Sequence, residues 1–367
     1  MDQGCSRIED QGRPVSGASP SRGPGEDRRS RAAAGERPRV YVIGTGGSIS
    51  CIGESRIDLI DYNYADKHFS IEEMLARIPE ACEKAEVRAE QFLNVYGGDV
   101  TPDQWLTLAR RINAILREDP QAAGVVVTHG TSTLEETAYF LNLTVKAERP
   151  VVVTGAMRPP TAISTDADMN LYDAIRVAAS PEAYGKGVLV VLNNHILAAR
   201  DAVKTSTSRL ETFTSNELGV LGYADSDGGV VFYRSPVRLH TTSTEFDADR
   251  IDALARVDLA YAYSGADGTA IEAFVKRGAR AIVGVGLGSG SAPRAFLKAL
   301  EAAREQGVVV VVASQSFNGR VMAKRTFLSR GFAVADNLPA KKARIVLMLA
   351  LAAPRSRDDI QRMMLTY

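Results

Sequence analysis

The chain has 367 residues, a hydrophobic content of 45% and 44 basic against 44 acidic side chains. This length allows two domains with sizeable cores, and the zero net charge argues against nucleic acid or an anionic membrane as the main partner. We therefore expect a small-molecule partner. No apolar run reaches the roughly 20 residues of a membrane span, and the N-terminus has no signal-peptide core, so a cytoplasmic location is expected.

The first 38 residues are rich in Gly, Ser, Pro and Arg and contain no Leu, Phe, Tyr or Trp. Such a segment cannot bury enough apolar surface to offset the entropy of ordering it. The composition predicts a disordered tail over residues 1–38. An overextended start codon would explain the same composition.

Short apolar runs that end in glycine-rich or hydroxyl-rich turns begin at Arg39. Continuous β-branched runs of this kind are typical of strands buried on both faces of a parallel sheet. They cover residues 39–47, 123–131, 149–157 and 187–194. Between the first two, Thr101–Gln104 predicts a capping box with Pro102 at the first helical position. This alternation of strands and helices predicts an α/β domain with a doubly wound, mainly parallel sheet.

A polar stretch interrupted by proline follows at residues 233–247, and the alternation then resumes. Further apolar runs cover residues 257–265, 279–290 and 307–316. We expect a larger N-terminal domain over residues 39–235, a linker over 236–247 and a smaller C-terminal α/β domain over 248–367.

Two strand-end turns are candidates for chemistry, because ligands of open α/β sheets bind beyond the carboxyl ends of the strands. In "IGTGGSIS", Gly46 and Gly47 let the backbone approach a ligand closely and present Ser48. In "THGTST", Thr131 and Ser132 follow a buried run. Either turn alone is also typical of a tight turn with a helix cap.

Metal chemistry has no support in the sequence. The three cysteines, Cys5, Cys51 and Cys82, are odd in number and widely spaced, which fits neither a disulfide framework nor a zinc site. The histidines apart from His129 have no metal-ligand spacing. We expect a reducing compartment, no metal and no cofactor.

Together and in this order, the two turns resemble those of the bacterial-type L-asparaginase/glutaminase family, whose hallmarks are a TGGT-I turn and an HGTDT turn. The resemblance covers residues 39–367. Further matching segments are "EETAYFLNLTVKAERPVVVTGAMRP", "NLYDAI", "GVLVVLNN", "RDAVKTSTSRLETF" and "LGY". It implies the asparaginase-like two-domain fold, hydrolysis of a small amide, and homodimers or homotetramers in which a second domain completes a neighbour's site.

The resemblance also assigns roles to individual residues. Ser48 matches the nucleophilic Thr, and Tyr64 matches the Tyr that assists it, with Tyr62 two residues away as the alternative. Thr131 matches the second catalytic Thr, and Lys204 the Lys behind it. A desolvated lysine suits this role because burial lowers its pKa toward the operating pH.

The chain departs from the family where the family binds the substrate's amino-acid head. Ser132 replaces the Asp of HGTDT, which binds the α-ammonium group. Gly97 and Gly98 replace a Ser and a Gln, so only Asp99 remains of that turn. Lys324 lies at or near the position of a Glu that reaches the ammonium from a neighbouring subunit.

Two of these positions also have purely structural interpretations. Ser132 or Thr133, followed three residues later by Glu135 or Glu136, would form a capping box. His129 is expected to be a packing or hydrogen-bonding residue rather than a base.

Burying a substrate ammonium without its carboxylate partners would be costly. We therefore expect an amidohydrolase with a hydroxyl nucleophile that acts on a small amide, or a lactone or imide, other than free asparagine. Gly97 and Gly98 would leave room for a larger substituent. Two alternatives stay open: a weak L-asparaginase/glutaminase, and a non-catalytic ligand-binding protein on the same fold.

Overall fold

The computed structural model describes residues 37–63 and 65–367. The tail predicted over residues 1–38 therefore falls almost entirely outside the described residues, and so does Tyr64. Residues 37–367 form one compact unit that contains two large sheets. Within the described ranges, no helix combines the length and the apolarity needed to cross a bilayer.

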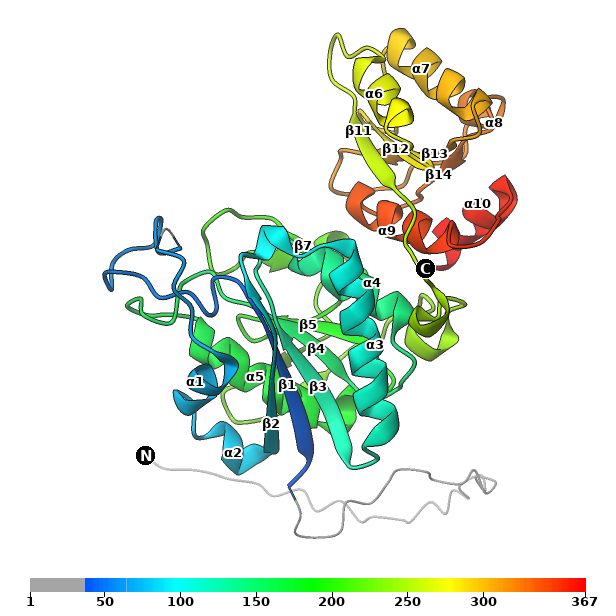
Figure 1. Ribbon diagram of the computed structural model, residues 1–367. Coiled ribbons are helices and arrows are strands. Elements are labelled where there is room, and N and C mark those ends of the chain that lie inside the picture. The colour runs from blue at the N-terminus through cyan, green and yellow to red at the C-terminus, as the bar shows by residue number, and fades with distance from the viewer. Residues whose placement is uncertain (1–36, 64) are drawn as a thin grey trace, which may run out of the picture. The chain divides into compact units, whose positions relative to one another are not determined.

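The larger sheet has eight strands in the order β10-β9-β6-β5-β4-β3-β1-β2, and Figure 1 labels β1 to β5 of them. The five strands from β5 to β2 are parallel, and β6, β9 and β10 extend the other edge in antiparallel pairing. The bounds are β1 Arg39–Gly46, β2 Glu86–Val95, β3 Ala122–Thr128, β4 Val151–Thr154, β5 Val188–Leu192, β6 His195–Ala198, β9 Gly222–Ala224 and β10 Val230–Phe232. The predicted mainly parallel sheet is thus confirmed, and its four predicted strands are β1, β3, β4 and β5.

Helices cover both faces of this sheet (Figure 1). One face packs on α3 (Pro102–Glu118) and α4 (Leu134–Thr144), and the other on α1 (Ile71–Ala76), α2 (Ala81–Lys84) and α5 (Ala167–Ala179). Helix α3 begins as predicted: the Thr101 side chain accepts from the Gln104 N–H, and Pro102 is the first helical residue.

The smaller sheet is entirely parallel, in the order β11-β12-β13-β14. Its strands are β11 Val257–Tyr261, β12 Ala281–Gly286, β13 Val309–Ser314 and β14 Ala333–Val334. Five helices accompany it: α6 Thr269–Lys276, α7 Arg294–Glu305, α8 Arg325–Leu328, α9 Ala340–Ala350 and α10 Arg357–Thr366. A larger mainly parallel sheet followed by a smaller one is the predicted α/β architecture.

The remaining elements are short. A two-stranded hairpin joins β7 (Val203–Lys204) to β8 (Phe213–Thr214), with Lys204 opposite Phe213. Single turns of 3-10 helix lie at η1 Gly97–Asp99, η2 Pro181–Ala183, η3 Asn216–Leu218, η4 Thr241–Ser243 and η5 Ala248–Arg250.

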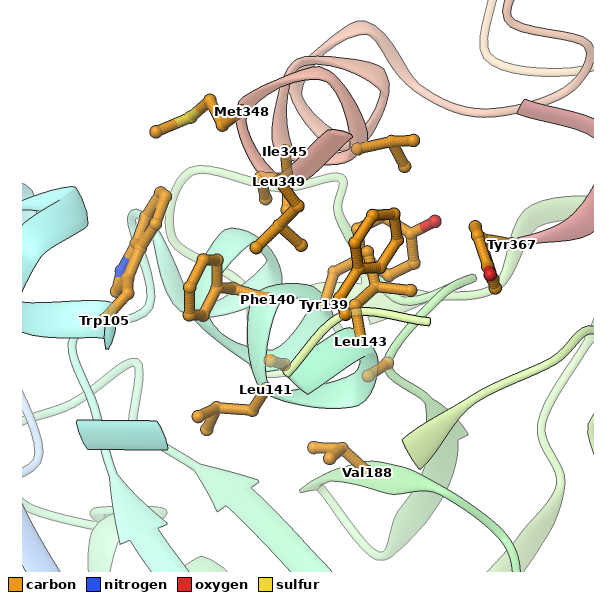
Figure 2. Packing of buried hydrophobic residues seen from close by; sticks show 14 of the residues in the cluster. Trp105, Tyr139, Phe140, Leu141, Leu143, Val188, Ile345, Met348, Leu349 and Tyr367 are labelled. Carbon is orange, nitrogen blue, oxygen red and sulfur yellow. The ribbon is translucent and has the colours of Figure 1, made fainter. Parts of the chain in front are cut away.

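Helix α9 packs on α4, so one hydrophobic cluster includes residues of both large sheets. Figure 2 shows Tyr139 and Phe140 of α4 beside Ile345 and Leu349 of α9, all of them buried. This packing holds the first turn of α9 against the region of α4 that follows the "THGTST" turn.

Candidate active site

The carboxyl ends of β1, β2 and β3 lie at one edge of the sheet, because the three strands are parallel neighbours. The turns that follow them touch through their backbones. A Cβ on Gly47 would lie 2.2 Å from the Gly130 Cα, and a Cβ on Gly97 would lie 2.6 Å from the same atom. Glycine at these positions allows the three turns to converge.

Ser48 follows two glycines with positive φ, 99° at Gly46 and 87° at Gly47. The Gly47 N–H donates to the carbonyl of Val95 at the end of β2, which fixes the turn. Ser48 is half-buried, and its hydroxyl lies 2.8 Å from the hydroxyl of Tyr62. The predicted nucleophile thus has a tyrosine within hydrogen-bonding distance.

That tyrosine is the alternative named from the sequence. Tyr64, the predicted partner, lies outside the described residues, so its role stays a prediction. Burial raises the pKa of Tyr62, and the hydrogen bond to Ser48 acts in the opposite direction. The Tyr62 hydroxyl is therefore protonated at neutral pH, and it can donate a hydrogen bond to Ser48 or accept one from it.

The segment that carries Tyr62 is attached at several points. Cys51 and His68 form an antiparallel bridge at its base. The Gly53 N–H donates to the Thr161 hydroxyl at 3.0 Å, and the Ile163 N–H donates to the carbonyl of Arg56 at 2.9 Å. These contacts place the loop over the turn that carries Ser48.

Thr131 and Lys204 are brought together as the resemblance implies. The Lys204 ammonium donates to the Thr131 hydroxyl at 2.7 Å, although the two residues are 73 positions apart in the chain. Thr131 is only 4% exposed. Burial lowers the pKa of Lys204 below its ordinary value, while the nearby Glu135 carboxylate acts in the opposite direction.

Glu135 and Lys341 belong to this cluster and were not predicted as site residues. Glu135 is 4% exposed; one carboxylate oxygen accepts from the Lys204 backbone N–H and the other from the Lys341 ammonium, both at 2.8 Å. In the sequence, Glu135 suggested only a helix cap. Lys341 lies 206 positions away and carried no signal of its own.

His129 is fully buried beside the Thr131 turn. Its Nδ1 lies 2.9 Å from the Gly130 carbonyl, and its Nε2 lies 2.9 Å from the Thr137 hydroxyl. Burial lowers the pKa of His129 to about 4, so the ring is neutral at pH 7. Nδ1–H then donates to the carbonyl and Nε2 accepts from Thr137, which fits the expected hydrogen-bonding role.

The capping box predicted from Ser132 or Thr133 is absent, although Thr133 is the N-cap residue of α4. Helix α4 begins after Thr133, whose side chain makes no cap hydrogen bond. The Thr133 hydroxyl donates instead to the carbonyl of Gly97 on the neighbouring turn. Ser132 is exposed at the turn and is not the N-cap residue.

The expectation that Gly97 leaves room for a larger substrate group is also wrong, because the backbone of Gly130 occupies that side. Gly98 differs: a Cβ there would meet only the ring of Tyr96, at 3.6 Å, which is an ordinary contact. Asp99 is exposed at the end of η1.

Lys324 lies directly before α8, beside the smaller sheet. Its ammonium donates to the carbonyl and hydroxyl of Ser289 and lies 5.8 Å from the ring centre of Phe327. The chain therefore does not bring Lys324 to its own Ser48, and a role across a subunit boundary stays a prediction.

Metal-binding groups are not assembled within the described ranges, where no three His, Cys, Asp or Glu side chains are placed to hold an ion. Cys51 is buried and Cys82 is exposed, and both are free thiols. Burial raises the pKa of Cys51 to about 11, so this thiol is not a nucleophile at neutral pH.

Comparison with known proteins places this geometry in a family. The family model "Asparaginase, N-terminal" matches residues 39–238, and "Glutaminase/Asparaginase C-terminal domain" matches residues 256–364. L-asparaginase 2 of Bacillus subtilis is 39% identical over 98% of this chain and 94% of its own length. A probable periplasmic L-asparaginase of Haemophilus influenzae is also 39% identical, over 91% of this chain and 94% of its own length.

Among solved structures, the crystal structure of a probable cytoplasmic L-asparaginase from Campylobacter jejuni has a TM-score of 0.83 and 37% identity, and the match covers 90% of this chain and 100% of that one. The fold and these matches define the class of the protein. It is an asparaginase-like α/β amidohydrolase, a class of enzyme that acts on carbon–nitrogen bonds of linear amides. The chain belongs to the glutaminase/asparaginase family.

Proposed function

We propose that this amidohydrolase hydrolyses a small linear amide by way of a covalent acyl-enzyme, with Ser48 as nucleophile. The Ser48 oxygen attacks the amide carbonyl, the carbon–nitrogen bond breaks, and ammonia leaves with the proton that Ser48 gives up. Water then attacks the ester, releases the acid and restores the hydroxyl. The 2.8 Å contact between the Ser48 and Tyr62 hydroxyls supports a tyrosine-assisted proton transfer.

The second hydroxyl pair supports the same chemistry. Thr131 holds its hydroxyl 2.7 Å from Lys204 Nζ, so a neutral Lys204 can accept the Thr131 proton while Thr131 orients the substrate carbonyl or the attacking water. Tyr64 lies outside the described residues, so its role as the assisting tyrosine stays a prediction from the sequence.

The proposed substrate lacks an α-ammonium group. The observation that supports this substrate class is the side chain that follows Thr131. Ser132 offers a hydroxyl there, where the family resemblance implies a carboxylate. Asp99 on the adjacent turn is exposed, and an ion pair made in water is weak. Gly47, Gly97 and Gly98 would contribute backbone rather than charged groups to the head of the substrate.

One other function has a specific observation in its favour. The relatives from Bacillus subtilis and Haemophilus influenzae are named L-asparaginases, which supports weak L-asparaginase/glutaminase activity as the second candidate. Asp99 would then be the carboxylate that receives the ammonium.

We further propose a cytoplasmic homodimer or homotetramer. The structural neighbour is titled cytoplasmic, although one relative is titled periplasmic. Val237 is 94% exposed and Tyr233 is 72% exposed, and apolar side chains of this size suit a contact with another copy. Lys324 would reach the head of the substrate in such a partner.

The test is ammonia release from asparagine, glutamine and amides without the α-amino group, such as succinamate, by wild type, Ser48→Ala and Thr131→Ala. We expect wild type to hydrolyse succinamate and each variant to lose about 100-fold or more in kcat. Mass spectrometry of a rapidly quenched reaction should find the acyl group on the peptide that contains Ser48. Full activity in Ser48→Ala would exclude this residue as the nucleophile.

A further inference from the structure

Helix α9 reaches the Thr131–Lys204 pair although its residues lie more than 130 positions further along the chain. We propose that Lys341 and Glu135 are positioning residues that set the protonation state of Lys204. This inference rests on the proposed function, in which neutral Lys204 serves Thr131. Lys341 holds the charge of Glu135 away from the Lys204 ammonium, so that Lys204 can lose its proton at a lower pH.

The two carboxylate oxygens of Glu135 accept hydrogen bonds from two different residues. Oε2 accepts from the backbone N–H of Lys204 at 2.8 Å, which fixes strand β7. Oε1 accepts from the Lys341 ammonium at 2.8 Å. The carboxylate is therefore next to Lys204 but is paired with the ammonium of Lys341.

The Lys204 ammonium, in contrast, points to a hydroxyl. Its hydrogen bond goes to Thr131 at 2.7 Å. Across the described part of the chain, the ion pairs of Glu135 include Lys341 but not Lys204. A partly buried ammonium that faces a neutral group, as Lys204 does, is destabilised relative to the free amine.

The other charges around Lys204 and Lys341 leave this balance in place. Glu136 on α4 lies 3.7 Å from Arg344 on α9, so its charge is partly offset. The Tyr261 hydroxyl on β11 also interacts electrostatically with Lys341. Burial lowers the pKa of Lys204, Glu135 raises it, and Lys341 lowers it further.

The neighbouring lysine on α9 has a different task. The Lys342 ammonium donates to the carbonyls of Ala199, Arg200 and Ala202 at 2.9, 2.7 and 2.7 Å, and these residues lead directly into β7. Lys342 therefore holds the backbone that carries Lys204. Lys341 pairs with the side chain of Glu135 and is 42% exposed, so its charge can be removed without opening the core.

The test compares three variants of the full chain: Lys341→Met, Glu135→Gln and the double variant. Lys341→Met leaves an unpaired carboxylate beside Lys204. The pH at which kcat reaches half of its maximum should therefore increase by about one pH unit, with KM nearly unchanged. Glu135→Gln should move it downward. The double variant should lie between the two, because both charges are gone.

A second readout keeps this test separate from the test of the function itself. The pH at which Lys204 becomes half-reactive toward acetic anhydride, measured by peptide mass spectrometry, needs no substrate. It should move in the same directions as kcat. Lys298→Met, which removes an exposed lysine on α7, is the control and should shift neither value.

The proposal is overturned if Lys341→Met leaves the Lys204 labelling midpoint at the wild-type value, or if both single variants shift it in the same direction. A merely structural role would lower kcat equally at every pH. If wild type hydrolyses no amide, the proposed function fails, while the labelling midpoints still decide whether Lys341 and Glu135 control Lys204.

Discussion

Two glycines position the hydroxyls of Ser48 and Thr131. Gly47 precedes Ser48 and Gly130 precedes Thr131, and the backbones of these glycines are in contact. A side chain on Gly47 would meet two obstacles, its positive φ of 87° and the Gly130 backbone. The separation of the two turns is therefore sensitive to a single methyl group.

We predict that Gly47→Ala lowers kcat by about 100-fold or more, because a displacement near 1 Å disrupts reacting geometry on that scale. Gly185→Ala is the matched control: φ is 69°, and a Cβ there would have no described atom within 4 Å. The control should cost only about 1 kcal/mol of stability and leave kcat unchanged. Wild-type kcat in Gly47→Ala would show that the turns do not need this contact.

Contacts between residues in recognisable motifs could be predicted from the sequence. Contacts between residues that only the fold brings together could not. The Thr131–Lys204 pairing follows from the resemblance and is present as a hydrogen bond. The capping box at Ser132 or Thr133 is absent because the carbonyl of Gly97, on another strand end, takes the Thr133 hydroxyl. The Lys341 contact depends on how α9 packs on α4, which no local pattern reveals.

At the scale of elements, α9 combines apolar packing with a buried charge. Lys342 is fully buried, and its ammonium lies 5.7 Å from the ring centre of Tyr139 on α4. Burial lowers the pKa of Lys342 to about 8. Its ammonium donates to three buried backbone carbonyls, and removing the side chain would take this charged donor away from all three.

We predict that Lys342→Met lowers the free energy of unfolding by about 3 kcal/mol, because buried carbonyls lose charged donors. Urea denaturation followed by circular dichroism measures this change. Lys298→Met on the exposed face of α7 should change it by less than about 0.5 kcal/mol. Equal stability of the two variants would mean that water replaces the ammonium and that the anchor is dispensable.

Strands buried on both faces were predictable, whereas edge strands were not. Residues 125–127 and 151–153 are continuous valines with almost no exposure, which is the pattern of a central parallel strand. Strand β2 (Glu86–Val95) lies at the sheet edge and contains charged and partly exposed residues throughout. Because β2 is polar, hydrophobic runs do not predict this strand, although it positions Gly97.

At the scale of the whole molecule, the alternation of strands and helices was enough to predict two α/β sheets of unequal size. The boundaries proposed at residues 235 and 248 stay predictions. One hydrophobic cluster includes residues from both sheets, from Ile43 to Tyr367, so the described chain forms one compact unit. Glu135, which contacts Lys204 near the larger sheet, is therefore also in contact with a helix that follows the smaller sheet.

The molecule has no net charge, so the preference for a substrate must come from local groups rather than from a long-range field. Ser132 is the local group with the largest expected effect on this preference. A carboxylate there would supply a partner for an α-ammonium group, and an exposed ion pair of this kind is worth at most about a factor of five in binding.

The most direct measurement is the ratio of kcat/KM for succinamate to that for asparagine, in wild type and in Ser132→Asp. These two amides differ only by the α-amino group. We predict that wild type prefers succinamate by about tenfold or more, and that Ser132→Asp moves the ratio toward asparagine by up to about fivefold. A wild type that prefers asparagine, with a ratio unmoved by Ser132→Asp, would contradict the proposed substrate class.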